Sequence, residues 1–95
     1  MKGIAKIGRK TKHLVKILQP QDFAVIDHAD LDTVAAKSLC EQKVAAVLNA
    51  QACLTGRYPT RGALLLLEHG IVVIDRLGKE IFQKIETGDS LELIG

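Results

Sequence analysis

Short apolar runs recur along the chain and alternate with segments of helical spacing. The runs Asp22–Asp27, Val44–Leu48 and Ile71–Ile74 are compact and bounded by polar or turn residues, as buried strands are. Of the intervening segments, Leu31 to about Gln42 repeats apolar residues at helical intervals, and Thr60–His69 is expected to be a second helix. The order strand, helix, strand, helix, strand predicts two βαβ units, and so an α/β fold with a small parallel sheet and right-handed crossovers.

The two ends of the chain add further elements to this pattern. At the amino-terminal end, Gly3–Ile7 predicts a short edge strand, and Thr11 is expected to cap a helix that runs to Leu18. At the other end, Lys79–Ile85 has helical spacing, whereas Ser90–Ile94 alternates apolar and polar residues as a half-buried strand does.

Residue types at the helix boundaries predict where the two central helices begin and end. Asp30 is expected to be the N-cap of the 31–42 helix, and Asp32 to favour the dipole of the same helix. Gly70 is expected to be the C′ residue of the 60–69 helix. The four consecutive leucines of that helix predict burial on most of its sides.

Composition sets bounds on the domain and on its partners. The 95 residues suffice for a single domain, residues 1–95, and only 3% of them are aromatic, so Leu, Ile, Val and Ala must build the core. Few aromatics and a net charge of +2 disfavour a nucleic-acid partner. The longest apolar run, Ala63–Leu67, is too short to span a membrane. Cys40 and Cys53 lack metal-ligand spacing, and without a preceding secretory signal both are expected to be reduced in the cytoplasm.

Positive charge is concentrated at the amino-terminal end. The first sixteen residues contain no acid and seven basic or histidine side chains: Lys2, Lys6, Arg9, Lys10, Lys12, His13 and Lys16. Such a run is either a basic arm for anionic lipid or nucleic acid, or the solvated face of a short helix.

The stretch from Thr55 to Gly62 joins an apolar strand to a helix and carries two glycines and two arginines. Backbone N–H groups at a helix N-terminus, with arginines beside them, favour anion binding. The candidate anion-binding residues are Asn49, Thr55, Gly56, Arg57, Thr60 and Arg61. The spacing is neither that of a Walker A loop nor that of a dinucleotide fingerprint, and arginines in a loop also serve protein interfaces.

A second polar cluster follows the first predicted buried strand. Asp27, His28 and Asp30 stand at its carboxyl end, where open parallel sheets place their ligands, and Asn49 ends the next strand. These side chains predict a polar pocket that also holds Arg57 and Arg61. Acids and a histidine could bind a divalent metal or act as acid and base, or they could merely cap the helix and form the turn.

Three segments resemble the SteA family of cytokinetic-ring proteins, which are related to thiamin pyrophosphokinase. The segments are Arg9–Val15, Ala24–Asp32 and Gly56–Pro59, and the similarity covers nearly the whole chain. It implies that residues 1–95 are the N-terminal module of a longer protein, with a kinase-like domain and a membrane anchor downstream. ATP and Mg would then belong to that downstream domain, with no cofactor in this one. The implied role is in bacterial cell division or separation, with protein partners and the chain's own downstream domain.

The chain also resembles, more distantly, the swivelling phosphohistidine domain of phosphoenolpyruvate-utilising enzymes. Thr60–Ala63, Glu68–Val72 and Gly88–Leu91 match that pattern in order and spacing. The resemblance implies a swivelling, three-layer domain of β/β/α type. The phosphoryl-carrying histidine of the pattern falls on Arg61, whose protonated guanidinium cannot attack phosphorus, so the resemblance argues against phosphocarrier activity.

Three functions follow from these patterns. The first is a non-catalytic binding or regulatory module for a protein partner or a phosphate-bearing small molecule, which Arg57 and Arg61 would recognise. The second is a contribution of Asp27, His28 or Arg57 to a composite site for diphosphoryl transfer with the downstream domain. The third is docking of the Lys2–Lys16 segment on a membrane surface or nucleic acid.

Overall fold

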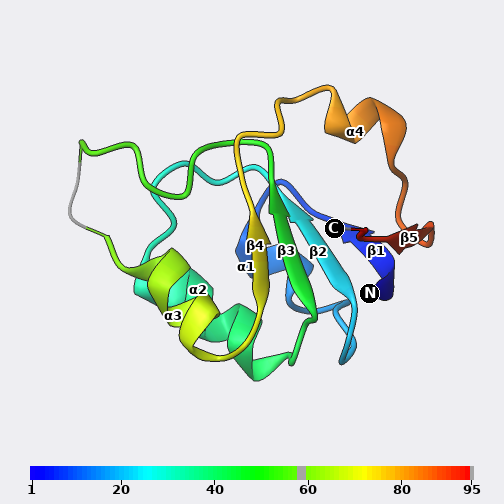
Figure 1. Ribbon diagram of the computed structural model, residues 1–95, viewed down its shortest axis with the longest axis horizontal. Coiled ribbons are helices and arrows are strands. Elements are labelled where there is room, and N and C mark those ends of the chain that lie inside the picture. Colours follow the sequence, from blue (N-terminus) through cyan, green and yellow to red (C-terminus); the bar gives the residue numbers. More distant parts are fainter. Residues whose placement is uncertain (58–59, 95) are drawn as a thin grey trace.

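The computed structural model describes residues 1–57 and 60–94 and contains one mixed sheet with helices on both of its faces (Figure 1). The strands lie in the order β4-β3-β2-β1-β5. Strands β1 to β4 are parallel, and β5 pairs antiparallel with β1. Their bounds are β1 Lys2–Ile7, β2 Phe23–Ile26, β3 Ala46–Asn49, β4 Val72–Ile74 and β5 Ser90–Glu92. The predicted α/β fold with a small parallel-sheet core is confirmed.

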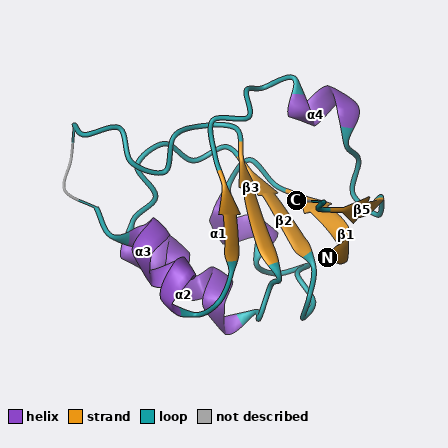
Figure 2. Cartoon of the chain, viewed as in Figure 1, coloured by secondary structure: helices purple, strands orange, loops and turns teal. Residues whose placement is uncertain are grey.

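The helices fall into two layers, one on each face of the sheet (Figure 2). The first three cross over between successive parallel strands, and the fourth covers the opposite face between β4 and β5. Their bounds are α1 Thr11–Leu14, α2 Thr33–Glu41, α3 Gly62–Glu68 and α4 Ile81–Lys84. No helix in residues 1–57 and 60–94 is both long and apolar enough to cross a membrane.

Two hydrophobic clusters share the sheet, which is why β2 is apolar at every position and β3 at every position except its last, Asn49. Ala24 and Ile26 of β2 pack under α1 to α3, whereas Phe23 and Val25 of the same strand pack toward α4. All four residues of β2 are fully buried. This alternation is the consequence of the two-residue period of a strand that is covered on both faces.

The amino-terminal strand is not at an edge, so that prediction is wrong. The carboxyl-terminal strand lies beside it, with Lys2 opposite Glu92 and Gly3 opposite Leu91. The true edges are β4 and β5. The pairing of β1 with a strand from the other end of the chain is a long-range contact, and the local sequence of Gly3–Ile7 cannot predict it.

Two helix starts differ from their predictions. Helix α1 ends at Leu14 instead of Leu18, and Thr11 is its first residue, with Lys10 at the N-cap and no side-chain cap. Helix α2 begins at Thr33, and its N-cap is Asp32, whose carboxylate accepts the Ala35 N–H at 2.7 Å. Asp30 has a left-handed φ of 52° and caps nothing.

The reason α2 starts late is a backbone pairing with the loop after β3. The N–H of Asp30 donates to the Ala52 carbonyl, and that of Leu31 donates to the Cys53 carbonyl, each at 3.0 Å. These bonds hold residues 30 and 31 in a non-helical path. The helix therefore begins two residues later, at the next available capping side chain.

Helix α3 confirms one prediction and corrects another. Gly70 has a φ of 75° and is the C′ residue, and the N–H groups of Gly70 and Ile71 close the helix on Leu67 and Leu66. The prediction that this helix is buried on most of its sides is wrong, because Leu64 is 51% exposed and Leu67 is 56% exposed. Leu66 alone of the four leucines is fully buried.

Candidate functional site

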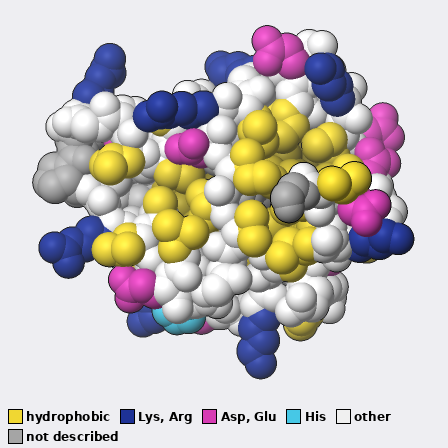
Figure 3. Space-filling model, viewed as in Figure 1, with side chains coloured by type: hydrophobic (Ala, Val, Ile, Leu, Met, Phe, Trp, Pro, Cys, Tyr) yellow, Lys and Arg dark blue, Asp and Glu magenta, His cyan; other side chains and the backbone are white. Residues whose placement is uncertain are grey.

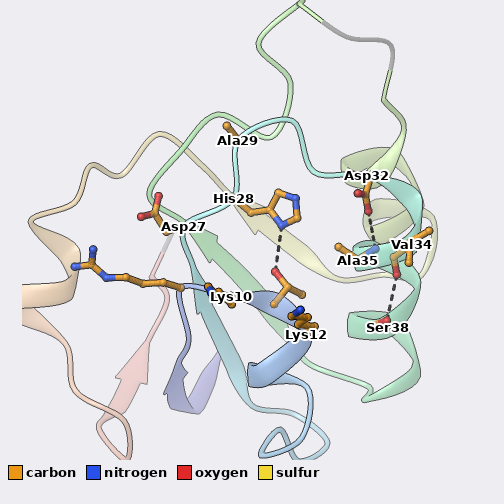
Figure 4. Close-up of a pocket in the computed structure, with 11 residues that line it drawn as sticks. Lys10, Lys12, Asp27, His28, Ala29, Asp32, Val34, Ala35 and Ser38 are labelled. Carbon is orange, nitrogen blue, oxygen red and sulfur yellow. Dashed lines mark hydrogen bonds between the residues drawn. The ribbon is translucent and has the colours of Figure 1, made fainter.

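A cleft opens where the carboxyl ends of β1 and β2 meet the start of α2. Its volume is about 480 Å³, and we call it the cationic cleft. Three segments form it: residues 9–12 after β1, residues 27–29 after β2, and the first turns of α2 (Figure 4). The lining side chains are Arg9, Lys10, Thr11, Lys12, Asp27, His28, Ala29, Asp32, Val34, Ala35 and Ser38. Because β1 and β2 are parallel neighbours, the segments that follow them emerge at one edge of the sheet.

Three cations define the charge of the cleft. Arg9, Lys10 and Lys12 are exposed, and they come from the basic run that the sequence placed near the amino terminus. The one salt bridge among residues 1–57 and 60–94 joins Lys6 to Asp22 at 2.7 Å, so none of the three cations is neutralised by an ion pair there. Arg9 lies over the ring of Phe82, 4.6 Å from its centroid, and so is oriented by a cation–π contact with α4.

His28 is held at the cleft from both its backbone and its ring. Its N–H donates to Asn49 Oδ1 at 3.0 Å, and its carbonyl accepts from Asn49 Nδ2 at 2.8 Å. The ring Nδ1 lies 3.2 Å from the Thr11 hydroxyl (Figure 4). This pairing leaves Nε2 as the ring nitrogen available to a ligand.

Asn49 uses its side chain for hydrogen bonds within the protein. It is fully buried, and besides His28 it accepts the Gln51 N–H at 3.0 Å and donates to Cys53 Sγ at 3.3 Å. Its side-chain oxygen and nitrogen are therefore both used within the protein. The sequence placed Asn49 among the anion-binding candidates, and its contacts give it the task of fixing the turn after β2.

The acidic turn does not gather its carboxylates around one point. Asp27 accepts from the Gln51 amide at 2.8 Å, Asp32 caps α2, and Asp30 binds Thr55 on the far side of the turn. Within the described residues, no group of three His, Cys, Asp or Glu side chains is placed to hold a metal ion. Of the two interpretations of this turn, capping and turn formation match the contacts.

Thr55 begins the stretch that runs to Gly62, which we call the arginine loop, and hydrogen bonds join it to Asp30. The Thr55 N–H and hydroxyl both donate to the Asp30 carboxylate at 2.8 Å. These two bonds lower the pKa of Asp30 from its usual value, and the charge of Arg57 adds to the effect. The Thr55 hydroxyl oxygen also accepts the Arg57 N–H at 3.2 Å. Gly56, with a φ of 90°, makes the turn between them.

The structure divides the expected polar pocket in two. Asp27 and His28 line the cationic cleft, whereas Arg57 and Arg61 do not. Arg61 and Thr60 instead line a second cavity of about 390 Å³, together with Asp32, Thr33 and Leu54. The Thr60 hydroxyl donates to the Leu31 carbonyl. Tyr58 and Pro59 of this loop lie outside the described residues.

Neither cysteine carries the marks of a reactive nucleophile. Both are free thiols, with Cys53 buried and Cys40 partly buried. Burial raises the pKa of both thiols, and the carboxylate of Glu41 adds to the rise at Cys40. At Cys53 the hydrogen bond from Asn49 offsets part of the rise in pKa, and the charge of Asp75 adds to it. The thiolate form is therefore disfavoured at neutral pH.

Sequence reasoning missed the association of the basic run with the turn after β2. The sequence shows Arg9, Lys10 and Lys12 as part of a charge cluster and Asp27 and His28 as part of a polar turn, and only the structure brings the two together. The available signal was the strand order, because residues that follow two adjacent parallel strands lie side by side. Comparisons of this chain with family models, with curated proteins and with solved structures found no match.

Proposed function

We propose that this domain is a non-catalytic binding module that recognises a phosphate-bearing small molecule in the cationic cleft. The observation that carries the proposal is that Arg9, Lys10 and Lys12 line the same cavity as His28. Cationic N–H donors are the groups that phosphate oxygens accept from most strongly. A ligand with phosphate or diphosphate oxygens therefore matches this lining.

The two carboxylates of the cleft do not cancel this preference. Asp27 and Asp32 each already accept a hydrogen bond from within the protein, from Gln51 and Ala35 respectively. Three cationic side chains outnumber them, so the lining keeps a net positive charge. The His28 ring supplies a further polar group at the same wall.

The size and the apolar part of the lining favour an organic phosphate over the inorganic ion. The cavity volume of about 480 Å³ is within the usual range for small-molecule sites and well above that of one phosphate group. Ala29, Val34 and Ala35 form an apolar wall, and Val34 is 76% exposed. Such a wall suits the non-phosphate part of the ligand.

The arginine loop supports anion recognition less well than the cleft does. Three of its six candidate residues, Asn49, Thr55 and Thr60, already use their polar side-chain groups in hydrogen bonds within the protein. Arg57 and Arg61 are exposed, and Arg61 is the N-cap of a helix without a side-chain cap. The loop therefore offers two surface charges, of which only Arg61 lines a cavity, and that cavity is smaller than the cleft, about 390 Å³.

The resemblance to the SteA family gives this proposal a biological setting. It suggests a regulatory module in bacterial cell division or separation, acting with a protein partner and with its own downstream domain. The alternative is a composite site for diphosphoryl transfer, and one observation favours it: Asp27 and His28 line the same cleft as the three cations. In that case the downstream domain would supply the remaining groups.

The test is an amide NMR titration of the 95-residue chain with phosphate, pyrophosphate, ATP and thiamin diphosphate. We expect saturable shifts in residues 9–12 and 27–38. Lys12→Ala should weaken binding by about tenfold or more, because a charge-assisted contact is lost. Lys16→Ala, an exposed lysine that does not line the cleft, is the matched control and should bind as the wild type does.

Two results would overturn the cleft as the site. Shifts confined to residues 55–62 and abolished by Arg57→Ala would place anion recognition on the arginine loop. An unchanged spectrum with all four ligands would exclude phosphate recognition by this chain. Turnover of ATP by the chain alone would contradict the non-catalytic part of the proposal.

A further inference from the structure

The sheet has an open edge at β4. This strand pairs with β3 alone among the described strands, and its three residues are all partly exposed. The Val72 N–H donates to the Ala45 carbonyl of the β3 side at 3.2 Å. Because backbone groups alternate along a strand, the N–H and carbonyl of Val73 point to the open side. They form a template for another strand.

Apolar side chains accompany this edge on the neighbouring helix. Leu64 and Leu67 of α3 are 51% and 56% exposed, whereas Gly62 and Leu66 on the other side of the helix are buried. In Figure 3, hydrophobic side chains gather on both sides of the region where Figure 1 places β4. The open edge therefore runs beside an apolar surface.

The charges at the ends of α3 are reversed relative to the helix dipole. Arg61 stands at its N-cap and Glu68 at its last residue, although a cation is favoured at the C-terminus and an anion at the N-terminus. Both side chains are exposed and neither makes an ion pair within the described residues. At 100° per residue, Arg61, Leu64 and Glu68 lie on one face of the helix.

We propose that a second copy of this chain pairs with this edge in a symmetric dimer. A two-fold axis beside the open edge of β4 makes the two β4 strands antiparallel neighbours, joined at Val73, and brings the two α3 helices side by side in opposite directions. Leu64 then contacts Leu64 of the partner subunit. Arg61 faces the partner's Glu68, and Glu68 faces the partner's Arg61.

The charge order on α3 is what selects a second copy as the occupant. A face with a cation at one end, leucine in the middle and an anion at the other end is complementary to itself when turned by a two-fold axis. Pairing also explains why charges unfavourable to the isolated helix occupy its ends. The cationic cleft lies at β1 and β2, two strands from the edge, so the dimer leaves it open.

The test is the association state of the wild-type chain and of charge variants, measured by sedimentation equilibrium up to about 1 mM. We expect a wild-type dimer, and a dissociation constant raised about tenfold or more by Arg61→Glu or by Glu68→Arg, because each change places like charges at two symmetric contacts. The double variant Arg61→Glu/Glu68→Arg restores both pairs and should dimerise again.

Arg57→Glu is the matched control, since Arg57 is exposed and lies outside the proposed interface. Hydrogen exchange at the Val73 amide gives an independent readout, because this N–H becomes bonded only in the dimer. A monomeric wild type would overturn the proposal. So would a dimer whose dissociation constant is unchanged by both Arg61→Glu and Glu68→Arg. The result does not depend on phosphate binding, so the failure of one proposal leaves the other standing.

Discussion

At the scale of single residues, polar side chains that hydrogen-bond within the protein shape the turns of this chain. Asn49 is fully buried and makes four hydrogen bonds, two of them to the backbone of His28. Asp30 and Thr55 join the turn after β2 to the loop after β3 in a similar way. These contacts decide the orientation of His28 and the path of the arginine loop.

Asn49→Ala should destabilise the domain by about 2–4 kcal/mol, because it leaves the N–H and carbonyl of His28 and the N–H of Gln51 without partners. Urea unfolding followed by circular dichroism measures the change. Gln51→Ala removes only the hydrogen bond to Asp27 and should lower the free energy of unfolding by about 1 kcal/mol at most. Equal effects of the two substitutions would contradict the role given to Asn49.

Thr55→Val should raise the pKa of the Asp30 carboxyl toward its ordinary value, because one of the two bonds that lower it is lost. A carboxyl whose pKa is lower in the folded than in the unfolded protein stabilises the fold at pH values above its unfolded-state pKa. This stabilisation is lost as the pH falls through the folded-state pKa. The variant should therefore lose less stability than the wild type on acidification. Carboxyl carbon NMR during an acid titration measures the pKa. Thr60→Val, which removes a bond to Leu31 instead, should leave it unchanged.

At the scale of elements, the position of α3 depends on a glycine at its first residue. Gly62 is buried where α3 meets the start of α2, and its N–H donates to the Leu31 carbonyl at 3.1 Å. A Cβ at this position would collide with the carbonyl oxygens of Leu31 and Asp32. The close approach of the two backbones is possible only because glycine has no side chain.

Gly62→Ala should destabilise the domain by about 1–3 kcal/mol, since α3 must move away from the start of α2. Thermal or urea unfolding measures the loss, and shifted amide resonances at residues 31–33 should locate it. Lys37→Ala, at an exposed position of the neighbouring helix α2, should change stability by no more than about 0.5 kcal/mol. If Gly62→Ala leaves the free energy of unfolding unchanged, α2 and α3 have room to separate.

At the scale of the whole molecule, one sheet divides the apolar side chains into two clusters. The cluster under α1 to α3 and the cluster under α4 both draw on β2 and β3, which have no solvent-facing side. The antiparallel strand β5 closes the sheet beside β1 and brings both ends of the chain together. The cationic cleft belongs to this scale as well, because residues 9–12, 27–29 and 32–38 meet only through the order of the strands.

Local boundaries were the part that sequence patterns predicted least well. The strands β2, β3 and β4 lie within the predicted runs or one residue beyond them, because continuous apolar runs are required wherever both faces of a strand are covered. The cap of α2 was assigned to Asp30 instead of Asp32, because both residues have a capping side chain and only the pairing with residues 52 and 53 excludes the first. Similarly, four leucines in succession cannot show which of them faces the core.

The sequence by itself determined the fold class, the parallel strands and the helix end at Gly70, because periodicity and glycine at a positive φ are local properties of the chain. Tertiary structure alone decided which polar residues would share a cavity. Asn49, Thr55 and Thr60 became internal hydrogen-bond partners, and Arg9, Lys10 and Lys12 came to line the cleft. The physical reason is that a binding site joins residues distant in sequence, and strand order and long-range backbone pairing set their separation.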